Sequence, residues 1–140
     1  MKTDEFFRIV MAAAPDRVRE AAKHVTAAVF HALRDRLTPE EGDQVAAQLS
    51  RQLQAVWIAG PRAGRRPVKM HRTEFYERVM KEVALPSVRE ARWMTLAVFA
   101  ALKEALTPGE AEDVLAQLPK DLKEVWAEAQ APAGPSGRAG

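Results

Sequence analysis

The sequence predicts an all-α protein in which two pseudo-symmetric helical repeats pack into one bundle. The first observation is an internal duplication, because residues 5–57 match residues 74–126 at a constant offset of 69 without a gap. The second is the spacing of apolar residues, which recur every three or four positions in both copies, as on one face of a helix. The third is size, because a unit of about 60 residues is marginal alone and gains stability by sharing a core.

Each copy reads as four helical pieces. A short first helix is predicted by Phe6 and Val10, which recur as Phe75 and Val79. A longer second helix is predicted by a buried stripe that is present in both copies. Its members are Ala22, Thr26, Val29, Leu33 and Leu37, repeated as Ala91, Thr95, Val98, Leu102 and Leu106. Asp16 and Ser87 are the expected N-caps of the two long helices, with Glu90 completing a capping box on Ser87.

The third helix has the clearest start signal. Thr38-Pro39-Glu40-Glu41 and Thr107-Pro108-Gly109-Glu110 place a threonine N-cap before a proline at the first helical position. A glutamate three residues after the cap predicts a capping box, in which its side chain bonds back to the threonine N–H. A fourth piece then closes each copy with Leu53, Val56 and Trp57, or with Leu122, Val125 and Trp126.

These elements divide the chain into residues 1–57 as the first repeat, 58–72 as a basic Pro/Gly linker, 73–130 as the second repeat and 131–140 as a disordered tail. The linker contains Gly60, Pro61, Gly64 and Pro67, which disfavour helix and central strand. The tail is almost entirely alanine, proline and glycine.

The pattern resembles the family of bacterial and archaeal helical proteins called domain of unknown function 2267. The resemblance rests on Glu-Phe-x-x-x-Val at Glu5 and Glu74, on Leu-x-x-x-Leu-Thr-Pro-x-Glu at Leu33 and Leu102, and on Ala-Gln-Leu-Pro-x-x-Leu at 116–122. The last string recurs at 47–53 with Ser50 in place of proline. The resemblance covers nearly the whole chain and implies a helical tandem-repeat fold. It implies no activity, cofactor or catalytic residue.

Metal, cofactor and catalytic sites are not expected. The absence of cysteine excludes disulfides and thiolate metal sites. His24 and His31 share a helix face, but seven residues along a helix separate them by about 10 Å, too far for one ion unless Glu20 or Asp35 joins them. The serines and threonines fall at caps and turns, and no phosphate-binding loop is present. The sequence therefore favours a protein that is not an enzyme.

The aromatic residues divide into two groups. Trp57, repeated as Trp126, is expected to seal the core together with Trp93, although each could also anchor a partner. Phe7 and Tyr76 lie beside the apolar stripe and are predicted to form an exposed edge or an oligomer contact.

The linker is the strongest charged feature. Residues 58–72 carry +5, residues 1–57 carry 0 and residues 73–140 carry −3. Its cations are the candidate contacts for an anionic partner and are Arg62, Arg65, Arg66, Lys69 and Arg72. They would bind nucleic acid without sequence preference, or pair with acidic residues of the second copy such as Glu74, Glu77 or Glu82.

The function that the sequence favours is a protein-binding or regulatory module, with an unknown protein partner or self-association through a groove between the two halves. Sequence-independent nucleic-acid binding through Arg62 to Arg72 is the alternative. The start of the chain lacks a secretory pattern and no apolar run approaches the roughly 18 residues of a membrane span, which predicts a cytoplasmic protein without membrane contact. The absence of asparagine resembles thermophile composition.

Overall fold

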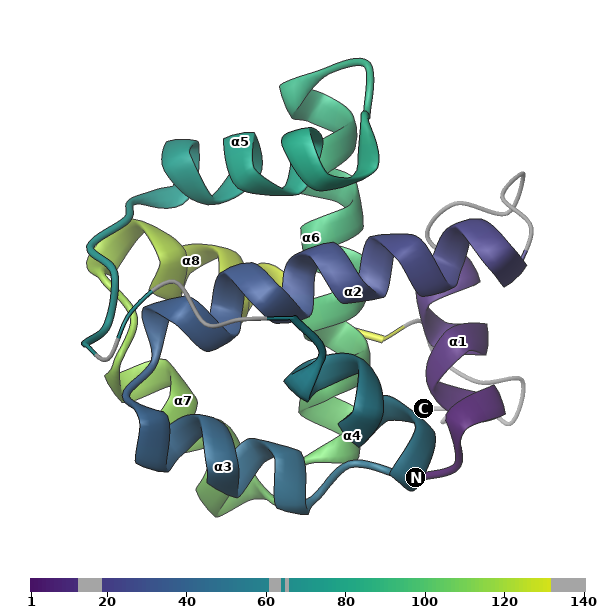
Figure 1. Cartoon of the computed structure of the whole chain (residues 1–140), viewed down its shortest axis with the longest axis vertical. Coiled ribbons are helices and arrows are strands. Elements are labelled where there is room, and N and C mark those ends of the chain that lie inside the picture. Colours follow the sequence, from purple (N-terminus) through teal and green to yellow (C-terminus); the bar gives the residue numbers. More distant parts are fainter. Residues whose placement is uncertain (13–18, 61–63, 65, 132–140) are drawn as a thin grey trace, which may run out of the picture.

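The computed structural model describes residues 1–12, 19–60, 64 and 66–131, and within them the chain is all-helical, as predicted (Figure 1). The predicted cap Asp16, linker residues Arg62 and Arg65, and most of the predicted tail lie outside the described residues. The helices are α1 Thr3–Ala12, α2 Arg19–Arg36, α3 Pro39–Ala47, α4 Arg51–Ile58, α5 Arg72–Val83, α6 Val88–Ala105, α7 Pro108–Ala116 and α8 Lys120–Glu128. None of these helices is long and apolar enough to cross a membrane.

The helices of the two copies begin and end at matching places. The long helices α2 and α6 have 18 residues each, and α3 and α7 have 9 each. The threonine caps are confirmed, because Thr38 and Thr107 accept hydrogen bonds from the backbone N–H groups of Glu41 and Glu110. Proline at the first position of α3 and α7 costs no hydrogen bond, since that N–H has no partner inside a helix.

The two copies interlock instead of packing side by side. Helix α1 packs against α6, and α5 packs against α2, so each short first helix covers the long helix of the other copy (Figure 1). The long helices also contact each other, as do α3 and α7. This exchange buries surface that neither copy covers alone. The overall pseudo-symmetric superposition of the two halves and the boundaries of the predicted domains stay predictions.

Aromatic rings organise the core in each copy. Phe30 packs edge-on between Phe6 and Trp57, with ring centroids 5.7 and 5.2 Å apart. The rings of Phe99, Phe75 and Trp126 repeat this arrangement at 5.7 and 5.0 Å. Such pairs stabilise a core by about 0.5–1.5 kcal/mol beyond their burial. The prediction that Trp57 and Trp126 seal the core is therefore confirmed.

Two predictions about aromatic residues are wrong. Phe7 and Tyr76 were expected at an exposed edge, but only 3% and 4% of their surface is exposed. Phe7 lies edge-on against Phe6, with its centroid 6.0 Å away, and the guanidinium of Arg19 lies over its ring. Trp93 shows the opposite error, since it does not seal the core and 46% of its surface is exposed.

The segment between α4 and α5 is attached to the bundle at its described end. The Val68 N–H donates to the Asp35 carbonyl oxygen at 2.7 Å, and the Met70 side chain is buried. The Asp35 carboxylate in turn accepts a hydrogen bond from Arg78 of α5 at 2.5 Å. These contacts hold the start of the second copy against α2.

Candidate functional site

Three of the five predicted linker cations, Arg66, Lys69 and Arg72, lie within the described residues. Arg66 and Lys69 are exposed, whereas Arg72 begins α5. The Arg72 backbone N–H donates to Asp121 at 3.1 Å, and its guanidinium lies 3.9 Å from Glu124. Its acidic neighbours are therefore on α8 and are not the glutamates that the sequence suggested.

The two histidines predicted to share a face do so, but they have separate partners. His24 is exposed and lies 4.0 Å from Glu20. The Nδ1 atom of His31 lies 3.0 Å from the Glu82 carboxylate, and its Nε2 atom lies 3.0 Å from the Val56 carbonyl oxygen. A polar oxygen therefore faces each nitrogen of the ring. His31 therefore joins α2 to α4 and α5.

These residues surround the first of two cavities that we call the polar cavity and the apolar cavity. The polar cavity has a volume of about 320 Å³, and its lining includes His24, Ala27, His31, Ala59 and Glu82. The apolar cavity also has about 320 Å³, and its lining includes Ile9, Ala12, Leu96, Ala97 and Ala100.

The two cavities occupy equivalent positions in the duplicated sequence. Leu96 and Ala100 stand 69 residues after Ala27 and His31, so the second copy has lost the histidine. The apolar cavity lies between α1 of the first copy and α6 of the second, with Glu128 and Ala129 from the end of α8 at its margin. One cavity is thus equipped for polar contacts and the other for apolar ones.

Trp93 stands one helical turn before Leu96 and Ala97 on the same face of α6. The guanidinium of Arg89 lies 5.5 Å from the centroid of its ring. The sequence contained a signal for this exposure, because the equivalent residue of the first copy is the polar His24, whereas Trp57 and Trp126 repeat each other.

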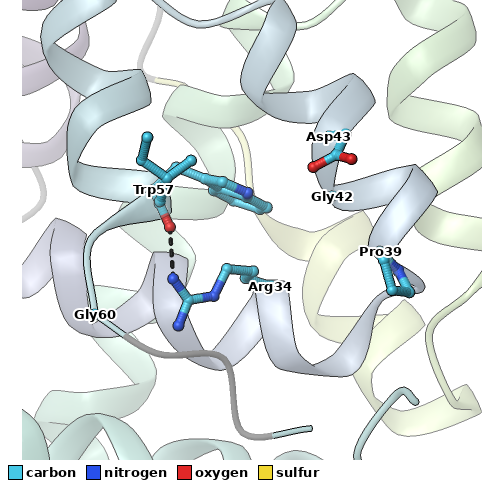
Figure 2. Close-up of a pocket in the computed structure, with 7 residues that line it drawn as sticks. Arg34, Pro39, Gly42, Asp43, Trp57 and Gly60 are labelled. Carbon is cyan, nitrogen blue, oxygen red and sulfur yellow. Dashed lines mark hydrogen bonds between the residues drawn. The ribbon is translucent and has the colours of Figure 1, made fainter. Parts of the chain in front are cut away.

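A third and smaller cavity of about 170 Å³ lies beside Trp57, between the end of α2 and α3 (Figure 2). Arg34 reaches across it, and its Nη1 donates to the carbonyl oxygens of Trp57 at 2.8 Å and Ala59 at 3.0 Å. Lys103, its equivalent, donates to the carbonyl oxygens of Trp126 and Ala129 at 2.9 and 2.8 Å, and burial lowers its pKa. Both cations bind the ends of helices, where carbonyl groups lack partners, so a structural role accounts for them.

The last candidate is a carboxylate cluster between α3 and α7. It consists of Glu41, Glu110 and Asp113, each of which contributes an oxygen within 4.8 Å of the other two. Glu41 and Glu110 are only 7% exposed. Burial raises the pKa of Glu41 to about 8, and a hydrogen bond to Glu110 and the charges of Glu110 and Asp113 act in the same direction.

The cluster corrects the predicted capping boxes of α3 and α7. The Thr38 N–H donates to Gln117 Oε1 at 2.9 Å, and the Thr107 N–H donates to Gln48 Oε1 at 2.9 Å. A glutamine from the opposite copy therefore accepts the hydrogen bond from each threonine N–H that the sequence assigned to Glu41 and Glu110. The side chains of Glu41 and Glu110 face each other instead. The sequence did not reveal this, because a capping box and a carboxylate cluster both use a glutamate at the third position of the helix.

The part of the chain that the structure describes is an all-helical bundle, and this defines the class of the protein. A family model described as an uncharacterized conserved protein, DUF2267, matches residues 3–125. The chain belongs to this family, as its motifs suggested. A search of curated proteins found no match.

Proposed function

We propose that the chain is a protein-binding module whose partner inserts an apolar segment into the apolar cavity beside Trp93. The observation that carries the proposal is the half-exposed Trp93, which stands one helical turn before Leu96 in the lining of a cavity of about 320 Å³ that both copies build. Cytoplasmic location and the absence of catalysis, both expected from the sequence, belong to the same proposal.

An exposed tryptophan beside an apolar hollow has the composition of an interface anchor. Tryptophan and arginine are enriched among the residues that dominate binding energy, and such residues lie near well-packed pockets. Trp93 and Arg89 supply these two residue types on adjacent turns of α6. Leu96 and Ala100 extend the same face toward Ile9 and Ala12 of α1. This geometry suits an amphipathic helix, which places its apolar residues at every third or fourth position.

The charges at the margin restrict the partner further. Arg92 is engaged by Glu128 at 2.6 and 2.8 Å, whereas the guanidinium of Arg89 lies over the Trp93 ring. An acidic residue on the partner would complement Arg89, and such pairs speed association and suppress wrong partners. The partner that we propose is thus an amphipathic helix with an acidic flank.

The proposal is tested by capture of the tagged full chain from its native lysate, with nuclease and at high salt, followed by affinity measurement with the captured protein. Trp93→Glu and Leu96→Glu are expected to weaken binding about tenfold or more, the loss typical of an anchor residue. Val88→Glu is the matched control, because Val88 is an exposed apolar residue at the start of the same helix, about two helical turns before Leu96. Equal binding by all three variants would contradict the proposal.

Nucleic-acid binding through the linker remains the alternative, and the exposed Arg66 and Lys69 favour it. Nucleic-acid binding requires that the protein is retained on nucleic acid and that this retention falls steeply as the salt concentration rises. Arg66→Glu with Lys69→Glu would abolish that retention and leave a partner bound at Trp93 unaffected. If the molecules captured by the wild-type chain are lost on nuclease treatment, nucleic-acid binding is supported over partner binding at the apolar cavity.

A further inference from the structure

We propose that Glu41, Glu110 and Asp113 form a binding site for one divalent cation that prefers oxygen ligands. The site lies where α3 meets α7, so each copy of the duplicated sequence contributes to it. The proposal is independent of the apolar cavity, with which it shares no lining residue.

The first argument is the charge that the cluster concentrates. Three carboxyl groups within 4.8 Å of one another repel strongly when ionised, and two of them are buried. Buried carboxylates are retained in proteins when a partner of opposite charge or a metal ion compensates them. A divalent cation supplies that compensation in one step.

The second argument is independent of charge and concerns hydrogen bonding. Among the described residues, the Oε2 atoms of Glu41 and Glu110 are both buried and have no hydrogen-bond partner. A buried acceptor without a partner costs about 1–3 kcal/mol. Two such atoms on facing helices are the arrangement expected of metal ligands.

The third argument is the identity and spacing of the donors. All three are carboxylate oxygens, which suit Mg²⁺, Ca²⁺ and Mn²⁺ better than softer ions. Ligand distances of about 2.0–2.6 Å to such ions allow one ion to reach oxygens that are within 4.8 Å of one another. Asp113 is exposed, so the ion can enter from solvent and keep water molecules on its open side.

The carboxylates coordinate the cation in their ionised form. A structure in which the carboxyl pair simply keeps its proton is the competing account.

The experiment uses the full chain after treatment with a chelator. Mn²⁺ is titrated while the free ion is followed by electron paramagnetic resonance, and Ca²⁺ and Mg²⁺ are then added as competitors. We expect one Mn²⁺ per chain in wild type, displaced by at least one of the competitors. Asp113→Asn and Glu110→Gln should each lower the affinity at least tenfold.

The controls separate a site from general attraction to acidic surface. Glu112→Gln removes a charge from the exposed face of the same helix and should leave Mn²⁺ binding unchanged. Asp113→Asn changes an exposed residue, so its loss of binding cannot be attributed to a damaged core. The proposal would be overturned if the wild-type chain bound no stoichiometric Mn²⁺. It would also be overturned if Asp113→Asn and Glu112→Gln weakened binding equally. Either result would leave the shared proton as the explanation.

Discussion

The carboxyl groups of Glu41 and Glu110 lie close together between α3 and α7, with oxygens within 4.8 Å of each other, although the two residues stand 69 positions apart in the sequence. Each occupies the third position of its helix, where the sequence predicts a capping box. The pair exists because Gln117 and Gln48 bond the N–H groups of Thr38 and Thr107 in their place. The two helices thus cap each other, which ties the copies together at their matching starts.

The pair predicts that stability depends on pH. The pKa of Glu41 is raised from 4.5 to about 8, so between these values the folded chain holds a proton that the unfolded chain releases. Stability of the metal-free protein should therefore fall as the pH rises through this window, by at most about 1.4 kcal/mol per unit, and level off above it. Urea unfolding in the presence of a chelator measures this slope.

Glu41→Gln is the variant that isolates the effect, because an amide has the shape of the protonated acid and does not titrate. We expect it to be more stable than wild type at pH 8 and to have a flatter pH profile. Glu40→Gln changes an exposed neighbour in the same turn and serves as the control. A Glu41→Gln profile parallel to that of wild type would show that this carboxyl group does not hold the proton.

The reciprocal caps predict a matched pair of losses. Gln117→Ala and Gln48→Ala should each lower the free energy of unfolding by roughly 0.5–1.5 kcal/mol, the usual contribution of one hydrogen bond. Gln44→Ala, an exposed change on α3, should stay within about 0.5 kcal/mol of wild type. Chemical denaturation of the three variants checks this, and losses no larger than that of Gln44→Ala would mean that the caps contribute little.

Gly42 offers a substitution that should stabilise the protein. It lies inside α3, and a Cβ atom there would meet Trp57 Nε1 at 3.8 Å and Cζ2 at 4.0 Å, which are ordinary contacts (Figure 2). The equivalent residue of the second copy is Ala111. Gly42→Ala should raise the free energy of unfolding by roughly 0.5–1 kcal/mol. A lower melting temperature would show that the third cavity cannot accept the methyl group.

The helices and the core were largely predictable because they follow from spacing and repetition. Phe6, Phe30 and Trp57 recur at the same offset as Phe75, Phe99 and Trp126, and a residue that both copies keep for packing reveals itself by recurring. The threonine caps were predictable for the same reason. Local patterns identify these features because each depends on neighbours a few residues away.

The candidate sites were much less predictable because they depend on contacts between copies. Nothing local shows that Gln117 would replace Glu41 at the Thr38 cap, so the carboxylate cluster was missed. The burial of Phe7 and Tyr76 was missed because it depends on tertiary contacts, such as that of Arg19 with the Phe7 ring, which the spacing of apolar residues does not reveal. The exposure of Trp93 had one signal in the sequence, which is that no tryptophan stands at the equivalent position of the first copy.

The most direct test of the central claim places a photo-crosslinking residue at position 93 of the full chain and, separately, at position 88. The partner is identified in its native lysate after nuclease treatment at high salt. The account predicts one protein that crosslinks through position 93 and not through position 88, at an amphipathic helix with an acidic flank. Equal crosslinking from both positions, or recovery of nucleic acid alone, would contradict it.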